Sequence, residues 1–162
     1  MGGPFTLTDQ NGRRVSDTAF AGKYRLVYFG YTFCPDVCPT DMATLGAGLR
    51  NFEASDPARA ARVQPIFITV DPARDTPAVL RRFVSHFHPR FIGLTGSEDE
   101  IAQVARSHRI FHERGGSEAG DGYLVSHSQI AVLYGPQGEP IAIVPHDQGP
   151  AGVSAELERR VR

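Results

Sequence analysis

Two periodicities alternate along the chain, and together they predict an α/β fold. Mostly apolar runs, which are typical of strands buried on both faces, predict strands at residues 25–31 and 63–70, and a shorter run predicts a strand at 91–94. The segments between them carry apolar residues at intervals of three and four, which indicates helices with one buried face. Strands that alternate with helices in this way favour a mostly parallel sheet with helices on both faces.

Capping residues and prolines mark where the predicted helices begin. The first helix is expected at 39–52, because Pro39 suits a first helical position. Thr76 before a proline has the pattern of an N-cap, and Ser97 with Glu100 forms a capping box for the next helix. A final helix is expected at 153–161.

Antiparallel strands are expected at both ends of the sheet. The Asn-Gly pair at 11–12, with apolar residues on either side, predicts a hairpin at 5–16. One long strand at 123–134 is expected to return through a glycine turn to a partner strand at 139–144. The segment 110–114 is expected to be extended.

The composition favours a single domain over residues 1–162 and argues against several classes of partner. The 162 residues are 41% hydrophobic and include ten phenylalanines, enough for a substantial core. A net charge of −1 gives no electrostatic case for nucleic acid or an anionic membrane surface. No apolar run is long enough to span a bilayer, and the start at Met1 looks artificial, so an upstream anchor or signal is left open.

The only two cysteines, Cys34 and Cys38, stand four positions apart just after the first buried run. Each precedes a proline, which disfavours helical backbone at both cysteines. Cys38 is therefore expected to be an N-cap and Pro39 the first helical residue, with Asp41 as a favourable charge in the first turn. The positive end of a helix then favours the thiolate form of the cysteines.

The cysteine spacing is compatible with more than one chemistry. Three intervening residues allow a disulfide, whose Cβ atoms lie about 3.5–4.5 Å apart. They equally allow two thiolates to share a soft metal ion, with metal–sulfur bonds of about 2.3 Å. An inert disulfide or two buried thiols is the alternative without a function. The two prolines, the single turn and the preceding strand favour a functional pair, but they do not choose between redox and metal chemistry.

Four motifs, in this order, make the chain similar to a known family. They are YFGYTFCPDVCP at 28–39, VDPARDTP at 70–77, FIGLTG at 91–96 and YLVSHS at 123–128. Together they resemble the Sco (SenC) family, thioredoxin-fold proteins that assemble the copper site of cytochrome oxidase. The resemblance implies that the predicted α/β fold is thioredoxin-like, with a mixed central sheet, helices on both faces and an N-terminal hairpin.

The resemblance also implies a metal site. In that family two cysteines and one histidine bind a single copper ion, and the matching positions are Cys34, Cys38 and His127, with the cysteines also forming a redox-active pair. Two thiolates and an imidazole suit Cu(I), with Cu(II) left open as a second state, whereas zinc would usually want a fourth ligand. The family usually has an aspartate where this chain has Ser126, which removes a negative charge beside the expected ligand.

The function implied by the resemblance is that of a copper metallochaperone for the binuclear copper site of cytochrome c oxidase. The expected partners are the oxidase subunit that receives copper and another copper chaperone as donor. The alternative is a thiol–disulfide oxidoreductase that reduces the target cysteines of that site, so enzyme activity depends on which function holds. A peroxidase or redox sensor is a weaker third hypothesis. The resemblance implies the bacterial periplasm, or the mitochondrial intermembrane space in eukaryotes, with tethering to the inner membrane through an anchor outside this chain. The arginine-rich composition favours the bacterial periplasm.

Several other polar residues have less specific interpretations. Asp71 and Asp75 follow the second buried run and are expected at the sheet edge of the cysteines, where they could support the metal ligands. Arg74 and Asp75 are expected to form a local turn network. The remaining histidines are expected to be structural or exposed; they are His86, His88, His108, His112 and His146.

Overall fold

The computed structural model describes residues 3–32, 37–110, 112–114, 125–127 and 130–162, and only the backbone of 37–38, 112–114 and 125–127. The strands are β1 (Thr6–Asp9), β2 (Arg14–Ser16), β3 (Tyr24–Gly30), β4 (Val63–Thr69), β5 (Ile92–Thr95), β6 (His112–Arg114), β7 (Val125–His127), β8 (Ala131–Tyr134) and β9 (Pro140–Val144). The helices are α1 (Val37–Ser55), α2 (Pro57–Ala60), α3 (Pro77–Ser85), α4 (Glu98–Ser107) and α5 (Gly149–Arg160), with short 3-10 turns η1 (Asp17–Phe20) and η2 (His146–Gln148).

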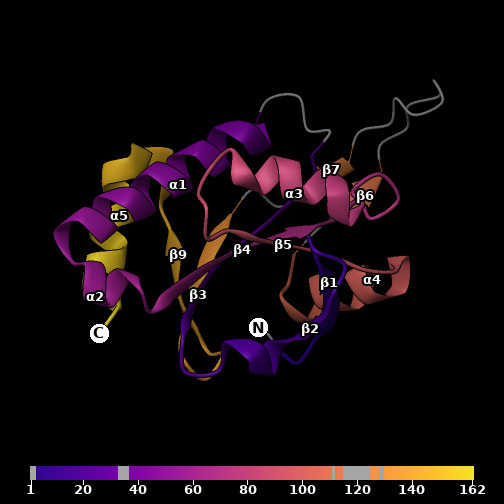
Figure 1. Ribbon diagram of the computed structural model, residues 1–162, viewed down its shortest axis with the longest axis horizontal. Coiled ribbons are helices and arrows are strands. Elements are labelled where there is room, and N and C mark those ends of the chain that lie inside the picture. Colours follow the sequence, from indigo (N-terminus) through magenta and orange to yellow (C-terminus); the bar gives the residue numbers. More distant parts are fainter. Residues whose placement is uncertain (1–2, 33–36, 111, 115–124, 128–129) are drawn as a thin grey trace.

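Strand β3 lies in the interior of a seven-stranded mixed sheet (Figure 1), whose order is β2-β1-β5-β4-β3-β8-β9. It pairs in parallel with β4 and antiparallel with β8, and β1 and β2 form the antiparallel N-terminal hairpin. All seven residues of β3 are buried, as expected for a strand covered on both faces. The predicted α/β class, the mixed central sheet and the hairpin are therefore confirmed.

Neighbouring residues of β3 face opposite layers of helices, because successive side chains of a strand alternate between its two faces. The Tyr28 hydroxyl donates to Asp41 of α1, whereas the ring of Phe29 lies 5.7 Å from the ring of His108, the residue after α4. Figure 1 shows α1 and α3 above the strands and α4 below them. Helices thus cover both faces, as predicted.

The capping signals place two helices correctly. Thr76 accepts a hydrogen bond from the backbone N–H of Val79 at the start of α3, and Ser97 and Glu100 form both bonds of the predicted capping box at the start of α4. In α1, Gly46 lies directly against the carbonyl oxygen of Phe87, where a Cβ would clash. This glycine therefore lets α1 pack closely against the segment after α3.

The predicted start of the first helix is wrong by two residues. Helix α1 begins at Val37, so Cys38 lies within its first turn instead of capping it, and Asp41 lies in the second turn. The error came from treating a residue before proline as necessarily extended. A proline in the first turn of a helix removes an N–H that has no intrahelical partner there, so the helix can include Pro39 and begin earlier.

The single strand predicted at 123–134 is also wrong, because its two ends belong to different sheets. β8 joins the central sheet and is buried at all four positions, whereas β7 pairs with β6 in a separate two-stranded ribbon. Ser126 and His127 are polar, and a strand enclosed on both faces by helices excludes such residues unless they are paired. The apolar residues of β8 therefore join the central sheet, whereas the more polar segment β7 does not.

Two further elements differ from expectation. Helix α2 was not predicted, although Asp56 caps it by accepting from the N–H of Arg59 and Pro57 is its first residue. The hairpin between β1 and β2 turns over four residues, 10–13, with Gly12 at a φ of +81°. The Asn-Gly signal located the turn correctly but implied a shorter loop than the one observed.

Candidate metal and thiol site

Two of the predicted ligands are reached from the same edge of the central sheet. In the antiparallel pair of β3 and β8, Tyr28 is opposite Ala131, so β3 ends at the edge where β8 begins. The chain leaves this edge after Gly30 toward Cys34, and it arrives there from His127, four residues before Ala131. Cys34 itself lies outside the described residues.

Cys38 is the second residue of the 19-residue helix α1. The first backbone N–H groups of a helix have no intrahelical partners, and the aligned peptide dipoles give this end a partial positive charge. A cysteine at such a position forms its thiolate more readily than a free cysteine does. The corrected helix boundary still places Cys38 at a helix N-terminus, and the activated thiol stays a prediction.

His127 is the last residue of β7, and the register of the ribbon places it directly opposite His112 of β6. Sequence reasoning assigned no function to His112, since the pairing of β6 with β7 was not predicted. Only the backbone of these two residues is described. Among the side chains that the structure describes, no three histidines, cysteines or acidic residues gather as a metal site would require, so the set of Cys34, Cys38 and His127 stays a prediction.

A buried polar network links the start of α1 to the sheet. The Tyr28 hydroxyl donates to Asp41 Oδ2 at 2.6 Å, and His146 Nδ1 lies 3.2 Å from the other carboxylate oxygen of Asp41. The His146 ring meets the Tyr28 ring edge-on at 6.0 Å. Sequence reasoning missed this network, because His146 of η2 lies more than 100 residues from both Tyr28 and Asp41 along the chain.

The loop after β4 supports the same edge of the sheet. Asp71 Oδ2 pairs with Arg74 Nε at 2.6 Å, which is the local turn contact expected of Arg74. Asp75 does not take part in that pair, contrary to the prediction, because its carboxylate accepts hydrogen bonds from Thr32 and Thr69. Burial raises the pKa of Asp75 above its ordinary value, and these hydrogen bonds offset part of that rise.

Three of the remaining histidines agree with the structural or exposed roles predicted for them. His86 is exposed at the end of α3. His88 is buried, with Nε2 2.8 Å from Glu53 and Nδ1 accepting from the N–H of Arg90. His108 is buried in the core, with Nδ1 3.0 Å from the carbonyl oxygen of Val104.

His108 should make the folded state sensitive to mild acid. Burial lowers the pKa of His108, and the positive charge of the nearby Arg25 lowers it further. The hydrogen bond to Val104 offsets part of this decrease. Since the unfolded state then takes up the proton first, stability is full above the unfolded pKa of about 6.5 and falls below it. His108→Phe keeps an aromatic ring beside Phe29, so its unfolding free energy should fall less than that of the wild type between pH 7.5 and 5.5 in urea titrations. A difference between the two proteins that stays constant with pH would contradict this.

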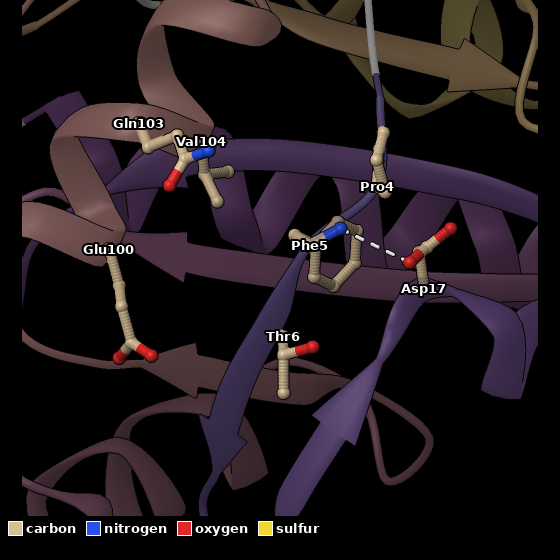
Figure 2. A pocket seen from close by; sticks show the side chains of 7 residues that line it. All are labelled: Pro4, Phe5, Thr6, Asp17, Glu100, Gln103 and Val104. Carbon is tan, nitrogen blue, oxygen red and sulfur yellow. Dashed lines mark hydrogen bonds between the residues drawn. The ribbon is translucent and has the colours of Figure 1, made fainter.

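A surface pocket lies beside the N-terminal hairpin (Figure 2), and this hairpin lies away from the start of α1 (Figure 1). It is lined by Pro4, Phe5, Thr6, Asp17, Glu100, Gln103 and Val104. One Asp17 oxygen accepts from the N–H of Phe5 at 3.1 Å, and Glu100 pairs with Arg14. The pocket contains no thiol or imidazole, and its two carboxylates are engaged with the protein, so it is not the site that the cysteines and His127 predict.

Comparison with known proteins gives one consistent relationship. The family model SCO1/SenC matches residues 1–162. The bovine protein SCO2 homolog, mitochondrial, is 46% identical over 136 residues, which are 84% of this chain and 50% of the bovine protein. This chain spans about half the length of the curated relatives it matches.

Solved structures extend the relationship to the fold. ScoI of Bradyrhizobium japonicum with copper bound superposes with a TM-score of 0.89 at 39% identity, covering 99% of each chain. BsSco, a member of the Sco family of cytochrome c oxidase assembly proteins with an identified disulfide switch, gives a TM-score of 0.71 at 25% identity, covering 97% of this chain and 91% of BsSco. The thioredoxin domain of a Bacteroides vulgatus thiol–disulfide oxidoreductase gives a TM-score of 0.68 at 17% identity, and the match covers 99% of this chain and 95% of the Bacteroides chain. This likeness shows that the fold is thioredoxin-like.

Proposed function

This chain belongs to the SCO1/SenC family, and from that premise we propose that it is a copper metallochaperone. It binds one copper ion through Cys34, Cys38 and His127 and transfers that ion to the binuclear copper site of a cytochrome c oxidase subunit. Copper is the cargo in this function. The receiving subunit is one partner, and another copper chaperone that supplies the ion is the other.

One observation carries the proposal: the pairing of β3 with β8. Its antiparallel register brings the end of the strand that precedes the cysteines beside the start of the strand that follows His127. Residues 93 positions apart in sequence, Cys34 and His127, are thereby attached to one sheet edge by short connections. Ligands from distant parts of a chain can share an ion only if the fold brings their attachment points together in this way.

The chemistry of these donors fits copper. Two thiolates and one imidazole form a soft, low-coordinate set that suits Cu(I), and the helix N-terminus at Cys38 favours the deprotonated thiol that a metal requires. Three protein ligands leave a position for a ligand from the receiving protein, so the ion can pass between proteins by ligand exchange. The copper bound to ScoI of Bradyrhizobium japonicum and the disulfide switch identified in BsSco are consistent with this donor set.

The second candidate function is thiol–disulfide exchange, favoured by the position of Cys38 at the start of α1. A thiolate of the reduced pair would attack the disulfide of a target protein, and the second cysteine would then displace the target thiolate from the mixed disulfide. The target gains two electrons and two protons, and this chain is left with a Cys34–Cys38 disulfide. That disulfide cannot hold copper, so each function excludes the other at a given moment.

The cellular location is a separate part of the proposal. No helix in the described part of the chain is both long enough and apolar enough to cross a bilayer. The bovine relative is mitochondrial, whereas one solved member is a lipoprotein from Bacillus anthracis with 22% identity to this chain. A periplasmic location with a membrane tether stays our proposal, based on the arginine-rich composition and the family.

An anaerobic Cu(I) titration of the reduced protein against a competing chelator tests the metallochaperone function. We expect one tight equivalent in the wild type and a loss of affinity in His127→Ala that exceeds the roughly 10–100-fold cost of removing a supporting residue at a metal site. His112→Ala is the matched control, because His112 occupies the opposite register position in the same ribbon.

The pair of variants separates a ligand from a general disturbance of the ribbon. Equal losses in both variants would indicate that the ribbon, and not the His127 imidazole, is what copper binding requires. Wild-type affinity in His127→Ala would exclude the three-ligand site. Weak binding by the wild type itself, together with turnover of a disulfide substrate, would favour the thiol–disulfide function.

A further inference from the structure

The carboxylate of Asp75 is fully buried and accepts three hydrogen bonds. Its Oδ1 accepts from the Thr32 hydroxyl at 2.6 Å, and its Oδ2 accepts from the backbone N–H of Thr32 at 3.0 Å. The Thr69 hydroxyl, at the end of β4, also donates to Oδ2 at 2.6 Å. Two of the three bonds therefore fix a single residue, Thr32, through both its backbone and its side chain.

Asp75 is itself held firmly from two sides. The Thr69 hydroxyl accepts from the N–H of Asp71 at 2.9 Å, which leaves its proton for Asp75. The Asp75 N–H donates to the Asp71 carbonyl oxygen at 3.0 Å, and the next residue, Thr76, caps α3. The acceptor for Thr32 is thus fixed to a buried strand and to the start of a helix.

Thr32 is the point at which the chain departs toward the cysteines. It comes two residues after β3 ends at Gly30 and two residues before Cys34. The parallel pairing of β3 with β4 places Gly30 beside Thr69, which brings the Asp75 loop to this point. A residue fixed through both its N–H and its hydroxyl has little freedom in φ, so the direction in which the chain continues is set here.

We propose that Asp75, through Thr32, is a positioning residue that holds the cysteine turn in the geometry from which it binds copper and forms its disulfide. The inference rests on the proposed function for its copper part. Its thiol part requires only that Cys34 and Cys38 form a pair. Releasing Thr32 lowers the effective concentration of one sulfur at the other, so both the disulfide and the two-thiolate copper site become less favourable.

Three substitutions alter the hydrogen bonds that the Asp75 carboxylate accepts to different extents. Asp75→Ala removes all three hydrogen bonds, and Thr32→Val removes only the bond from the hydroxyl. Asp75→Asn is the conservative variant: its amide oxygen can accept from the Thr32 N–H and the Thr69 hydroxyl, and its NH₂ group can donate to the Thr32 hydroxyl. We therefore expect Asp75→Asn to behave more like the wild type than Asp75→Ala does.

The control is Glu53→Gln, which disturbs a comparable cluster at the far end of α1. Glu53 lies 2.8 Å from His88 Nε2 and 3.0 Å from Arg90 Nη2, so its replacement costs stability without touching Thr32. The readouts are the equilibrium constant of the cysteine pair in dithiothreitol redox buffers, the Cu(I) dissociation constant and the melting temperature. The first two would not respond to a residue that only stabilises the fold.

In Asp75→Ala the equilibrium constant for the disulfide should fall about tenfold, equivalent to about 30 mV, and Cu(I) should bind about tenfold more weakly. Thr32→Val should lie between Asp75→Ala and the wild type, and it keeps the test available if Asp75→Ala does not fold. Glu53→Gln should lower the melting temperature alone.

Two results separate the failure of this inference from the failure of the proposed function. If Asp75→Ala and Thr32→Val melt earlier but keep wild-type redox and copper constants, Asp75 acts only on stability and the inference is overturned. If the wild type binds no copper tightly but Asp75→Ala still shifts the thiol equilibrium, the positioning role holds and the metallochaperone function fails.

Discussion

Cys38→Ser should abolish tight Cu(I) binding while leaving the protein folded. Serine has nearly the same shape, but its hydroxyl stays protonated at neutral pH and is a hard ligand that Cu(I) does not favour. The loss should be larger than that of His127→Ala, because one of the two anionic donors disappears. It should therefore exceed the roughly 10–100-fold cost of losing a supporting residue. The same anaerobic chelator competition measures it.

Ala43→Ser is the matched control for this variant. Ala43 is an exposed residue of α1, five positions beyond Cys38, so the substitution puts the same hydroxyl on the same helix outside the proposed site. It should bind Cu(I) as the wild type does. Cys38→Ser should also be unable to form the intramolecular disulfide, which a thiol count after oxidation would show. Wild-type Cu(I) affinity in Cys38→Ser would remove Cys38 from the ligand set.

Phe67→Ala should destabilise the fold by about 3–5 kcal/mol, the usual cost of deleting a buried aromatic side chain. Phe67 is fully buried in the middle of β4. Its ring stacks on that of Tyr28 with centroids 6.5 Å apart, and it lies 5.0 Å from the ring of Phe83 on α3. The substitution therefore leaves a cavity between the sheet and α3, and it also removes aromatic contacts worth about 0.5–1.5 kcal/mol per pair.

Urea unfolding would measure this loss, with Ile143→Ala as the control. Ile143, on β9, is 63% exposed, so its truncation should change the unfolding free energy by no more than about 0.5 kcal/mol. Equal m-values would show that both variants unfold between the same two states. A loss below about 1 kcal/mol in Phe67→Ala would mean that the neighbouring side chains refill the space.

The parts of the fold that could be predicted from sequence are those determined locally or by burial. β3 and β4 are buried at nearly every position and are mostly apolar, because both of their faces are covered. The starts of α3 and α4 depend on side chains within three residues of the cap, which makes them visible in sequence. The start of α1 was misplaced because a proline tolerated in a first turn looks in sequence like a boundary.

The contacts that were missed depend on register between distant segments. Asp75 and Thr32 are 43 residues apart, and they meet because Gly30 pairs with Thr69. No local signal distinguishes an aspartate that bonds its own turn from one that reaches the neighbouring strand. In the same way, the position of His112 opposite His127 depends on the pairing of β6 with β7, which no local sequence pattern indicates. The cysteines were recognisable because their motif is contiguous.

The proposed ligands belong to two parts of the fold that we expect to unfold locally at different free-energy costs. His127 lies in the two-stranded ribbon, and Cys38 lies in α1, which packs on the main sheet. β6 and β7 pair with each other and, among the described strands, with no strand of the seven-stranded sheet, whereas α1 follows the fully buried β3. Amide hydrogens of β3 should exchange only through global unfolding, and those of the three-residue strands of the ribbon through cheaper, sub-global openings. A bound ion would bridge these two parts of the fold. If copper binds as proposed, its release would then begin with dissociation of the His127 imidazole, because the ribbon can open while the central sheet stays folded.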